Sequence, residues 1–499
     1  MKVRGSSFFI SAPYLLIVLF IPLLFLLISA IHLSPSKYMY QVLYSALLQS
    51  ILQASVSTFF AGLLGVSIGL LLLVYNGKFK EIIISFMLIT YVMPGLIMAI
   101  GIISVFNYDS RFFEIVLGNV IFNSPMIAVL AYSTGASTSI QEINSAKVLG
   151  ASDSQILKKF YLRNSARGAL LGSLFAFILC FEGFSLPLII GGPQFSTVEV
   201  LIYLFKRIFV YYSSYQFSAA SFIALVQFTT LLIPLFLYIS IKPPPSKRGT
   251  GQIHNMKGAG IALPFLVLFI LFLFIPFIFI FIKYPLNPAS LLDVEKRIGV
   301  SVITLTLNTI LFSISSTMLS FLISLIFVSR SSFFSRFTVM LPMIVSPVSL
   351  ALGFYLAYGE ISGSSLLLIF IFTALEIPIT IRMIQQAVDT IPISEKMSSR
   401  ILGDSFFSSL LKVQLPRIRS ETTSVLSLIF ITVMGEFSAV ATVYTKSTET
   451  ITIGIYQLLL LKDLAGTYTL TELFIIVIFM SSLFINYIGK SDTIGKTYS

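Results

Sequence analysis

Apolar runs long enough to cross a lipid bilayer recur along the whole chain, and this feature limits the possible folds more than any other. A transmembrane helix needs about 17 to 25 mostly apolar residues. Only 10% of the 499 residues are charged, whereas 57% are hydrophobic. We assign twelve predicted spans, at residues 7–31, 46–75, 82–106, 112–137, 167–190, 216–241, 260–283, 301–329, 334–358, 364–385, 421–445 and 470–489. They lack the alternation of a membrane barrel and predict an all-α integral membrane protein with about 12 transmembrane helices.

The distribution of charge predicts the orientation of the chain. The net charge is +12 at pH 7, and most of the 32 Lys and Arg residues fall on one side of the predicted spans. Since basic loops remain in the cytoplasm, we expect a multi-pass protein of the cell membrane with both termini cytoplasmic. Membrane lipid is a sufficient partner for this charge, and nucleic acid is not an expected partner. With one cysteine, Cys180, and two distant histidines, neither a disulfide nor a metal site is expected.

The two halves of the chain resemble each other at an offset of 253 residues. The stretch SAKVLGASDSQILKKFYL at residues 145–162 returns as SSRILGDSFFSSLLKVQL at residues 398–415. Pro94 also falls on Pro347 at this offset. Residues 242–259 are rich in Pro, Gly and basic residues and are predicted to form a cytoplasmic linker. We therefore predict two parallel six-span repeats, one transmembrane domain at residues 1–241 and another at residues 260–499.

Each repeated segment predicts a helix, a turn and a second helix in a cytoplasmic loop, at residues 141–165 and 394–418. Gly150 and Gly403 stand where a sharp turn favours a residue that tolerates positive φ. Apolar residues follow each glycine at helical spacing: Ile156, Leu157, Phe160 and Tyr161 in the first loop, and Phe406, Phe407, Leu410 and Leu411 in the second. We expect these stripes to dock a partner, and a pair of helices lying on lipid is the alternative.

The two segments resemble the EAA loop of ABC importer permeases, whose pattern is roughly Glu-Ala-Ala, three residues, Gly and, a dozen residues later, Leu-Pro. The matching positions are Asn144, Ser145, Ala146, Gly150, Leu157 and Leu162 in the first loop and Met397, Ser398, Ser399, Gly403, Leu410, Leu415 and Pro416 in the second. Both copies lack the glutamate. The runs GGPQFSTVEVLIY and MGEFSAV are also similar to segments of this family. The fusion of two domains is similar to permeases for ferric iron, thiamine and aminoethylphosphonate.

This resemblance implies a transport permease that is not itself an enzyme. It implies two ABC ATPase subunits bound to the two loops and an external substrate-binding protein. ATP and Mg would bind to the partner ATPase, and this chain would bind no cofactor. The C-terminal GKSDTIGKT looks superficially like a phosphate-binding loop. It has five residues between its glycines, where that motif has four, and it follows a predicted span rather than a strand, so we do not interpret it as a nucleotide site. The fused architecture favours ferric iron or thiamine as substrate, with an oxyanion, polyamine or phosphonate still open.

Charged residues and prolines inside the predicted spans are the candidates for a substrate pathway. Glu182 and Glu436 occur at nearly equivalent points of spans 5 and 11 and either face a shared pathway or bond a neighbouring helix. Pro94 and Pro347 interrupt the backbone ladder of spans 3 and 9, as hinges or as static kinks. Glu376 and Arg382, at the cytoplasmic end of span 10, are predicted to anchor the span at the membrane interface.

Two other function classes are weighed against the importer. An ion-gradient-driven secondary transporter can also have two six-span halves. The loop after the second span, NGKFKE, lacks the Gly, Asp and Arg signature usual in that class. A membrane enzyme would need converging metal ligands or paired acids, and no such motif occurs in the sequence.

Overall fold

The computed structural model of the chain describes residues 13, 16–106, 110–192, 195–207, 213–241, 259–328, 341–401 and 403–494, and every regular element within these ranges is helical. Two compact units are present. Unit A comprises residues 34–204 and 226–283, and unit B comprises residues 1–33, 205–225 and 284–499. The predicted linker lies outside the described residues, except that a helix begins at Ala259.

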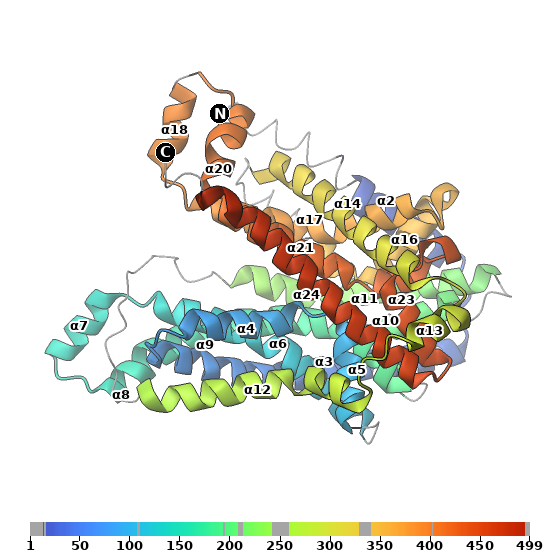
Figure 1. The fold of residues 1–499 in the computed structure, drawn as a ribbon, viewed down its shortest axis with the longest axis horizontal. Helices are drawn as coiled ribbons and strands as arrows, with labels where there is room; N and C mark the ends of the chain where they lie inside the picture. The colour runs from blue at the N-terminus through green and yellow to red at the C-terminus, as the bar shows by residue number, and fades with distance from the viewer. Residues whose placement is uncertain are drawn as a thin grey trace. The chain divides into compact units, whose positions relative to one another are not determined.

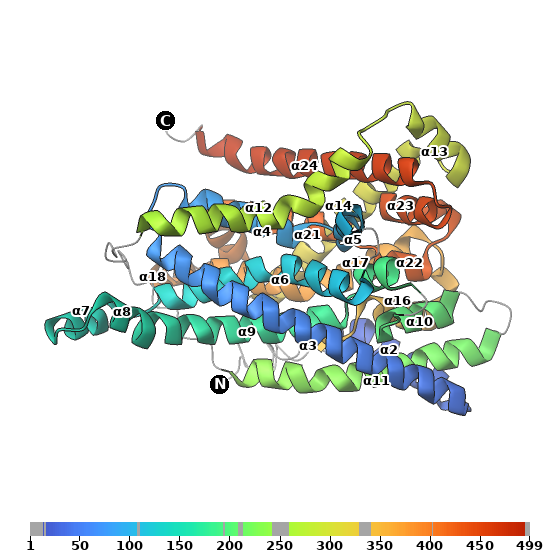
Figure 2. The same cartoon turned by 90° about the horizontal axis from the view of Figure 1, so that it is seen from below.

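Long helices and short connecting turns alternate in both units (Figures 1 and 2). Unit A contains α3 (Lys37–Val74), α4 (Lys80–Val92), α5 (Gly95–Phe106), α6 (Arg111–Ala136), α7 (Ile140–Val148), α8 (Asp153–Ile156), η2 (Leu157–Tyr161), α9 (Leu162–Phe181), η3 (Pro187–Gly191) and α12 (Ala259–Lys283). Unit B contains η1 (Leu16–Phe20), α2 (Ile21–Ile31), α13 (Ser290–Ile298), α14 (Val302–Val328), η5 (Leu341–Ile344), α16 (Pro347–Ala357), η6 (Gly359–Ile361), α17 (Ser365–Asp389), α18 (Ile393–Ile401), α19 (Phe406–Ser409), η7 (Leu410–Gln414), α20 (Leu415–Arg417), α21 (Arg419–Met434), α22 (Ser438–Val443), η8 (Lys446–Thr448), α23 (Ile451–Leu460) and α24 (Leu464–Ile494). The residues of α10 (Val198–Arg207) and α11 (Ser213–Ser240) are divided between the units.

Eight helices in the described residues are long and apolar enough to cross a membrane. A ninth span is formed if α4 and α5 count together, although they meet at an angle of 96°. Other predicted spans correspond to shorter apolar helices, at Leu16–Ile31 and Pro347–Ala357. The structure therefore confirms an all-helical protein with many spans, and the predicted number of twelve stays a prediction.

The core of unit A is a bundle of α3, α6 and α9 that is joined by buried polar side chains. Gln53 on α3 donates a hydrogen bond to the carbonyl oxygen of Cys180 on α9 at 2.6 Å. Asn119 on α6 in turn donates to the side-chain oxygen of Gln53 at 2.8 Å. Because no water competes for such donors in a membrane, these bonds favour one arrangement of the three helices.

The core of unit B repeats this bundle with α14, α17 and α21. Here the buried face of α14 carries small polar residues, among them Ser313, Ser316 and Ser320. The hydroxyl group of Ser316 donates to the carbonyl oxygen of Ile369 on α17 at 3.2 Å. Small residues of this kind let helices approach closely in lipid.

Each unit includes a helix from the other half of the sequence. In unit B, α2 packs on α16, where a Cβ atom added to Gly353 would lie 2.9 Å from Cβ of Pro22. In unit A, α12 packs on α5, where a Cβ atom added to Gly101 would lie 2.8 Å from Cβ of Pro276. Each compact unit therefore contains segments from both halves of the sequence. The division into domains at the linker stays a prediction.

Several contacts recur at the predicted offset of 253 residues. Phe184 and Tyr203 form an edge-to-face pair with ring centroids 5.2 Å apart, and Phe437 and Tyr456 repeat it at 5.2 Å. Turns of π-helix occur at the same offset, η2 at Leu157–Tyr161 and η7 at Leu410–Gln414. These matched contacts show that the repeat extends from sequence to structure.

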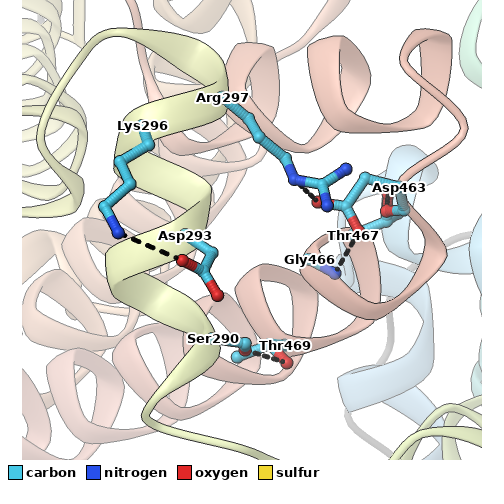
Figure 3. A network of polar contacts seen from close by, with 8 residues as sticks. All are labelled: Ser290, Asp293, Lys296, Arg297, Asp463, Gly466, Thr467 and Thr469. Atoms are coloured by element: carbon cyan, nitrogen blue, oxygen red, sulfur yellow. Dashed lines mark hydrogen bonds and ion pairs between the residues drawn. The ribbon is translucent and has the colours of Figure 1, made fainter.

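At one end of unit B, α13 is fastened to the start of α24 by polar contacts (Figure 3). Arg297 forms an ion pair with Asp463 at 3.2 Å. The other carboxylate oxygen of Asp463 accepts a hydrogen bond from the backbone N–H of Gly466 at 3.1 Å and so caps α24. Ser290 also donates to the hydroxyl group of Thr469 at 3.1 Å. The Asp463 carboxylate thus caps the N-terminus of α24 and also binds Arg297 of α13.

Candidate functional site

The first repeated loop consists of α7, a turn at Gly150 and α8, and it projects beyond the end of α9 (Figure 1). Gly150 has φ +83°, so the predicted positive φ is confirmed. The hydroxyl oxygen of Ser152 accepts from the N–H of Gln155 at 3.3 Å, and the Gln155 side chain accepts from the N–H of Ser152 at 3.0 Å. This capping box begins α8 directly after the turn.

The second loop has the same plan, with α18, a turn at Gly403 and α19. Gly403 has φ +95°, which again confirms the predicted conformation. The Asp404 carboxylate accepts hydrogen bonds from the hydroxyl groups of Ser408 at 2.7 Å and Ser399 at 2.9 Å. These bonds hold the pKa of Asp404 below its ordinary value, and they join the two helices across the turn.

The apolar stripe predicted to dock a partner faces inward in the first loop. Ile156 and Tyr161 are buried, and they pack with Leu73 of α3 and Ile143 of α7. Ile156 and Tyr161 therefore hold the loop on its own bundle, while a docking role for the stripe stays a prediction. In the second loop Leu410 is fully buried and Leu411 is 44% exposed, whereas the side chains of Phe406 and Phe407 lie outside the described part of the chain.

The most exposed apolar side chains of the loops lie on the other side of each turn. Val148 and Leu149 are 88% and 86% exposed at the end of α7. On α18, Ile393, Met397 and Ile401 are 71%, 57% and 83% exposed. Each loop thus presents an apolar tip formed by the helix before the glycine.

The other loop residues predicted from the resemblance lie around these tips. Those on the exposed surface are Asn144, Ser145, Ser398 and Pro416. Those that are partly or fully covered are Ala146, Leu157, Ser399 and Leu415, while Leu162 is 37% exposed. Although the family glutamate is absent, Glu395 pairs with Arg417 at 3.7 Å, which links α18 to α20.

Both predicted pathway prolines lie at helix boundaries. Pro94 is buried between α4 and α5, where the chain turns through 96°. Pro347 is the first residue of α16, and the preceding Ser346 caps that helix by accepting from the N–H of Ser349 at 3.2 Å. Proline suits the first position of a helix because its missing N–H has no intrahelical partner there. Predicted spans 3 and 9 are therefore interrupted, and span 3 is sharply bent.

Both predicted pathway glutamates lie where a helix ends inside a predicted span. Glu182 follows α9, and Glu436 lies between α21 and α22. The Glu436 carboxylate accepts from the N–H of Ala439 at 3.0 Å and so caps α22. One carboxylate oxygen of Glu182 is buried without a hydrogen-bond partner in the described residues. Glu182 and Glu436 thus occupy nearly equivalent helix breaks but differ in their hydrogen bonds.

Two buried acids were missed as site residues by the sequence reasoning. Glu376 is only 9% exposed on α17, so its predicted role as a surface anchor is wrong. Glu199 on α10 is fully buried and accepts from the side chain of Gln227 at 2.8 Å. The rule that an acid inside an apolar segment marks a functional candidate would have selected Glu376. Within the described residues, no three His, Cys, Asp or Glu side chains are grouped as metal ligands would be.

Comparison with known proteins connects this architecture to one family. The family model described as "binding-protein-dependent transport system inner membrane component" matches residues 61–241, a region that contains the first loop, α6 and α9. This match supports an ABC importer inner membrane permease. Proteins of the matched family are inner membrane transport components that work with a binding protein, and the several long apolar helices of this chain agree with a multi-pass membrane protein.

The chain is also similar to curated transport proteins. The spermidine/putrescine transport system permease protein PotC of Escherichia coli K12 is 24% identical over 207 residues, which cover 41% of this chain and 76% of the relative. The protein of the same name from Shigella flexneri is 24% identical over 162 residues, which cover 32% of this chain and 61% of the relative.

Proposed function

We propose that the chain is the membrane-spanning subunit of an ATP-driven importer and that its two loops dock two ABC ATPase subunits. The observation that carries this proposal is the pair of exposed apolar tips, Val148 with Leu149 and Met397 with Ile401. Large apolar side chains this exposed outside a membrane span are typical of a surface that a partner covers. Their repetition at equivalent places matches two equivalent partner subunits.

In this proposal the ATPase subunits bind ATP and Mg, and their closure biases the transmembrane helices between two access states. Residues 1–241 and 260–499 act as the two transmembrane domains, and both termini lie in the cytoplasm with the loops. An external binding protein delivers the substrate. The burial of Ile156 in the first loop and of Leu410 in the second supports transmission of that movement from the loops to the bundles.

For the substrate, we propose a small cation. The fused architecture resembles permeases for ferric iron and thiamine, while the curated relatives are named for spermidine and putrescine. All four carry positive charge, so ferric iron, thiamine and a polyamine are the cargoes to compare. Uptake of each labelled compound into vesicles of the native membrane, supplied with the native binding protein and internal ATP, would select among them.

Purification of the tagged permease from its native membrane tests the docking surface. We expect an ATPase to copurify at about two copies per chain. The double variant Leu149→Asp with Ile401→Asp should lose it, because charges at the tips oppose burial. Ser154→Asp adds a charge at an exposed position of the same loop and serves as the matched control.

Two results would contradict the proposal. One is retention of the ATPase by the double variant. The other is recovery of the wild-type chain alone under conditions that preserve a known importer complex. In the second case, uptake abolished by a protonophore but unaffected by ATP depletion would favour the gradient-driven transporter.

A further inference from the structure

A groove lies between α17 and α21 in unit B, at the ends of these helices that adjoin the second loop. Its volume is about 410 Å³, within the range of about 300 to 1,000 Å³ that is usual for ligand sites. Helix α17 ends at Asp389, shortly before α18 begins at Ile393, and α21 begins at Arg419, directly after the loop. The groove therefore lies at the base of the second loop.

The lining of the groove combines an apolar floor with a polar rim. Met383 is partly buried, and Ala387 and Val425 are buried. The polar residues of the lining, Glu421 and Ser424 among them, are exposed. Exposed polar side chains at the ends of two spans belong in water or among lipid headgroups, because burying them in hydrocarbon is costly. The groove thus suits a ligand with an apolar part that arrives from water.

The equivalent helices of unit A are in close contact at this place. At the 253-residue offset, Glu421 corresponds to Gly168 and Val425 to Gly172. A Cβ atom added to Gly168 on α9 would lie 2.5 Å from the carbonyl oxygen of Leu130 on α6, and one added to Gly172 would lie 3.1 Å from Cδ1 of Leu130. Small residues permit such an approach. Because Glu421 and Val425 have side chains, α17 and α21 cannot approach in the same way, and the groove remains between them.

Glu421 gives the groove its charge. Of the described residues that line the groove, Glu421 alone is charged, and Arg382 and Arg419 are not part of the lining. Within the described part of the chain, no Lys or Arg side chain forms an ion pair with Glu421. Since unit A has a glycine at the equivalent position, the bundle packs without a charge there. A carboxylate above an apolar floor attracts a ligand that joins a cationic group to a hydrocarbon part.

We propose that the groove between α17 and α21 binds a small organic cation, with its cationic group against Glu421 and its hydrocarbon part on Met383 and Val425. The inference rests on the proposed function for the identity of the cation and for the side from which it arrives. The groove is on the side of the loops, so its ligand is cargo that has been released there. The proposed function is thereby deepened, since unit B gains a site at which released cargo binds.

Cysteine accessibility tests the site because Cys180 is the only cysteine of the chain and is buried. The full-length Ser424→Cys variant, which places a thiol in the lining, would be purified in a maltoside detergent that has no ammonium group. Its alkylation by uncharged iodoacetamide at pH 7 would be followed alone, with putrescine, with thiamine, or with 1,4-butanediol, the uncharged analogue of putrescine. We expect putrescine or thiamine, at ten times its half-protecting concentration, to slow alkylation about tenfold by occupancy of the groove. Butanediol should not slow it.

Three further variants separate the groove from general effects of the cations. Thr423→Cys places the thiol on the neighbouring residue of α21, which does not line the groove, and neither cation should protect it. Glu421→Gln combined with Ser424→Cys should still be alkylated but should lose the protection. Glu360→Gln combined with Ser424→Cys removes an exposed carboxylate outside the groove and should keep the protection.

Several results would overturn the proposal. They are an unreactive Ser424→Cys thiol, equal alkylation with and without both cations, equal protection by butanediol or at Thr423→Cys, protection that survives Glu421→Gln, and protection that Glu360→Gln also removes. Copurification of the ATPase is scored separately. A chain that retains its ATPase but shows no protection refutes the groove site alone. Recovery of the wild-type chain without an ATPase refutes the proposed function, while the alkylation rates still decide whether the groove binds a cation.

Discussion

At the residue scale, Gly150 and Gly403 carry the turns of the two loops through backbone conformation alone. Their φ values are positive, and a Cβ atom added to either would meet nothing within 4 Å. We predict that Gly150→Ala or Gly403→Ala destabilises the turn by about 1 to 2 kcal/mol, the usual cost of this conformation for a residue with a side chain.

Hydrogen exchange measures this cost directly. The N–H of Ala151 bonds to Ala146 across the first turn, and the N–H of Asp404 bonds to Ser399 across the second. Both should exchange faster in the variants. Gly260→Ala, which adds a methyl group to open space at the start of α12, should leave them unchanged. Unaltered exchange in the loop variants would show that the turns do not depend on glycine.

Asp404 makes the second loop sensitive to acid. Because the Ser408 and Ser399 hydroxyl groups lower its pKa in the folded loop, its stabilising effect is complete above the ordinary Asp pKa of about 3.9. That effect is lost as the pH falls through the lowered value. We predict a carboxyl titration by carbon NMR with a midpoint below the ordinary value.

The hydroxyl groups are the cause to be tested. In the Ser399→Ala and Ser408→Ala double variant, the Asp404 midpoint should return toward the ordinary value. A midpoint that does not move would assign the lowered pKa to another neighbour, such as Lys412.

Residue-level sequence reasoning succeeded where local sterics decide the outcome. Positive φ at Gly150 follows from a turn between two short helices, and the structure confirms it. The direction of the apolar stripe depends on neighbours distant in sequence, and Ile156 turns inward because Leu73 covers it. The burial of Glu376 depends in the same way on the helices that pack against α17, namely α14 and α21.

At the scale of elements, the contacts between α5 and α12 and between α2 and α16 have no room for a side chain. Cβ atoms at Gly101 and Gly353 would lie under 3.0 Å from Pro276 and Pro22. We predict that Gly101→Val or Gly353→Val lowers stability by about 1 to 3 kcal/mol, as overpacking usually does.

Thermal unfolding in detergent would detect this loss as a lower midpoint. Gly260→Val is the matched control because its Cβ atom meets nothing within 4 Å. An unchanged unfolding midpoint for both test variants would mean that moving these helices apart to fit the added side chain does not lower stability.

Predicting elements from hydropathy found the spans but not their interruptions. The break at Glu436 follows Gly435, and the bend at Pro94 joins two helices of 13 and 12 residues. A hydropathy window averages over such breaks because their flanking residues are apolar. Hydropathy also identifies α2 and α12 as spans, but it does not indicate that α2 packs on α16 or that α12 packs on α5.

At the scale of the whole molecule, the exchange of α2 and α12 makes each half of the sequence dependent on the other. Residues 1–241 alone lack α12, which leaves the face of α5 around Gly101 uncovered. We predict that this half aggregates or is degraded when expressed alone. Coexpression of residues 1–250 with residues 251–499 should restore a complex that copurifies through a tag on either piece.

A half that is stable alone, with the same unfolding midpoint as the coexpressed pair, would contradict this prediction. The exchanged helices would then be peripheral to folding. The Gly101→Val variant of the split pair should copurify less well than the unaltered pair, which connects this experiment to the helix contacts.

The π turns at Leu157–Tyr161 and Leu410–Gln414 have a further consequence. A π turn holds about one residue more than an α turn, and each residue of an α-helix advances the direction of its side chain by about 100°. Both turns lie between a loop and the span that follows it, at the same offset. The one additional residue in each π turn therefore rotates the loop about the axis of the following helix. Because both halves contain the same turn, the two apolar tips are rotated by the same amount relative to their spans.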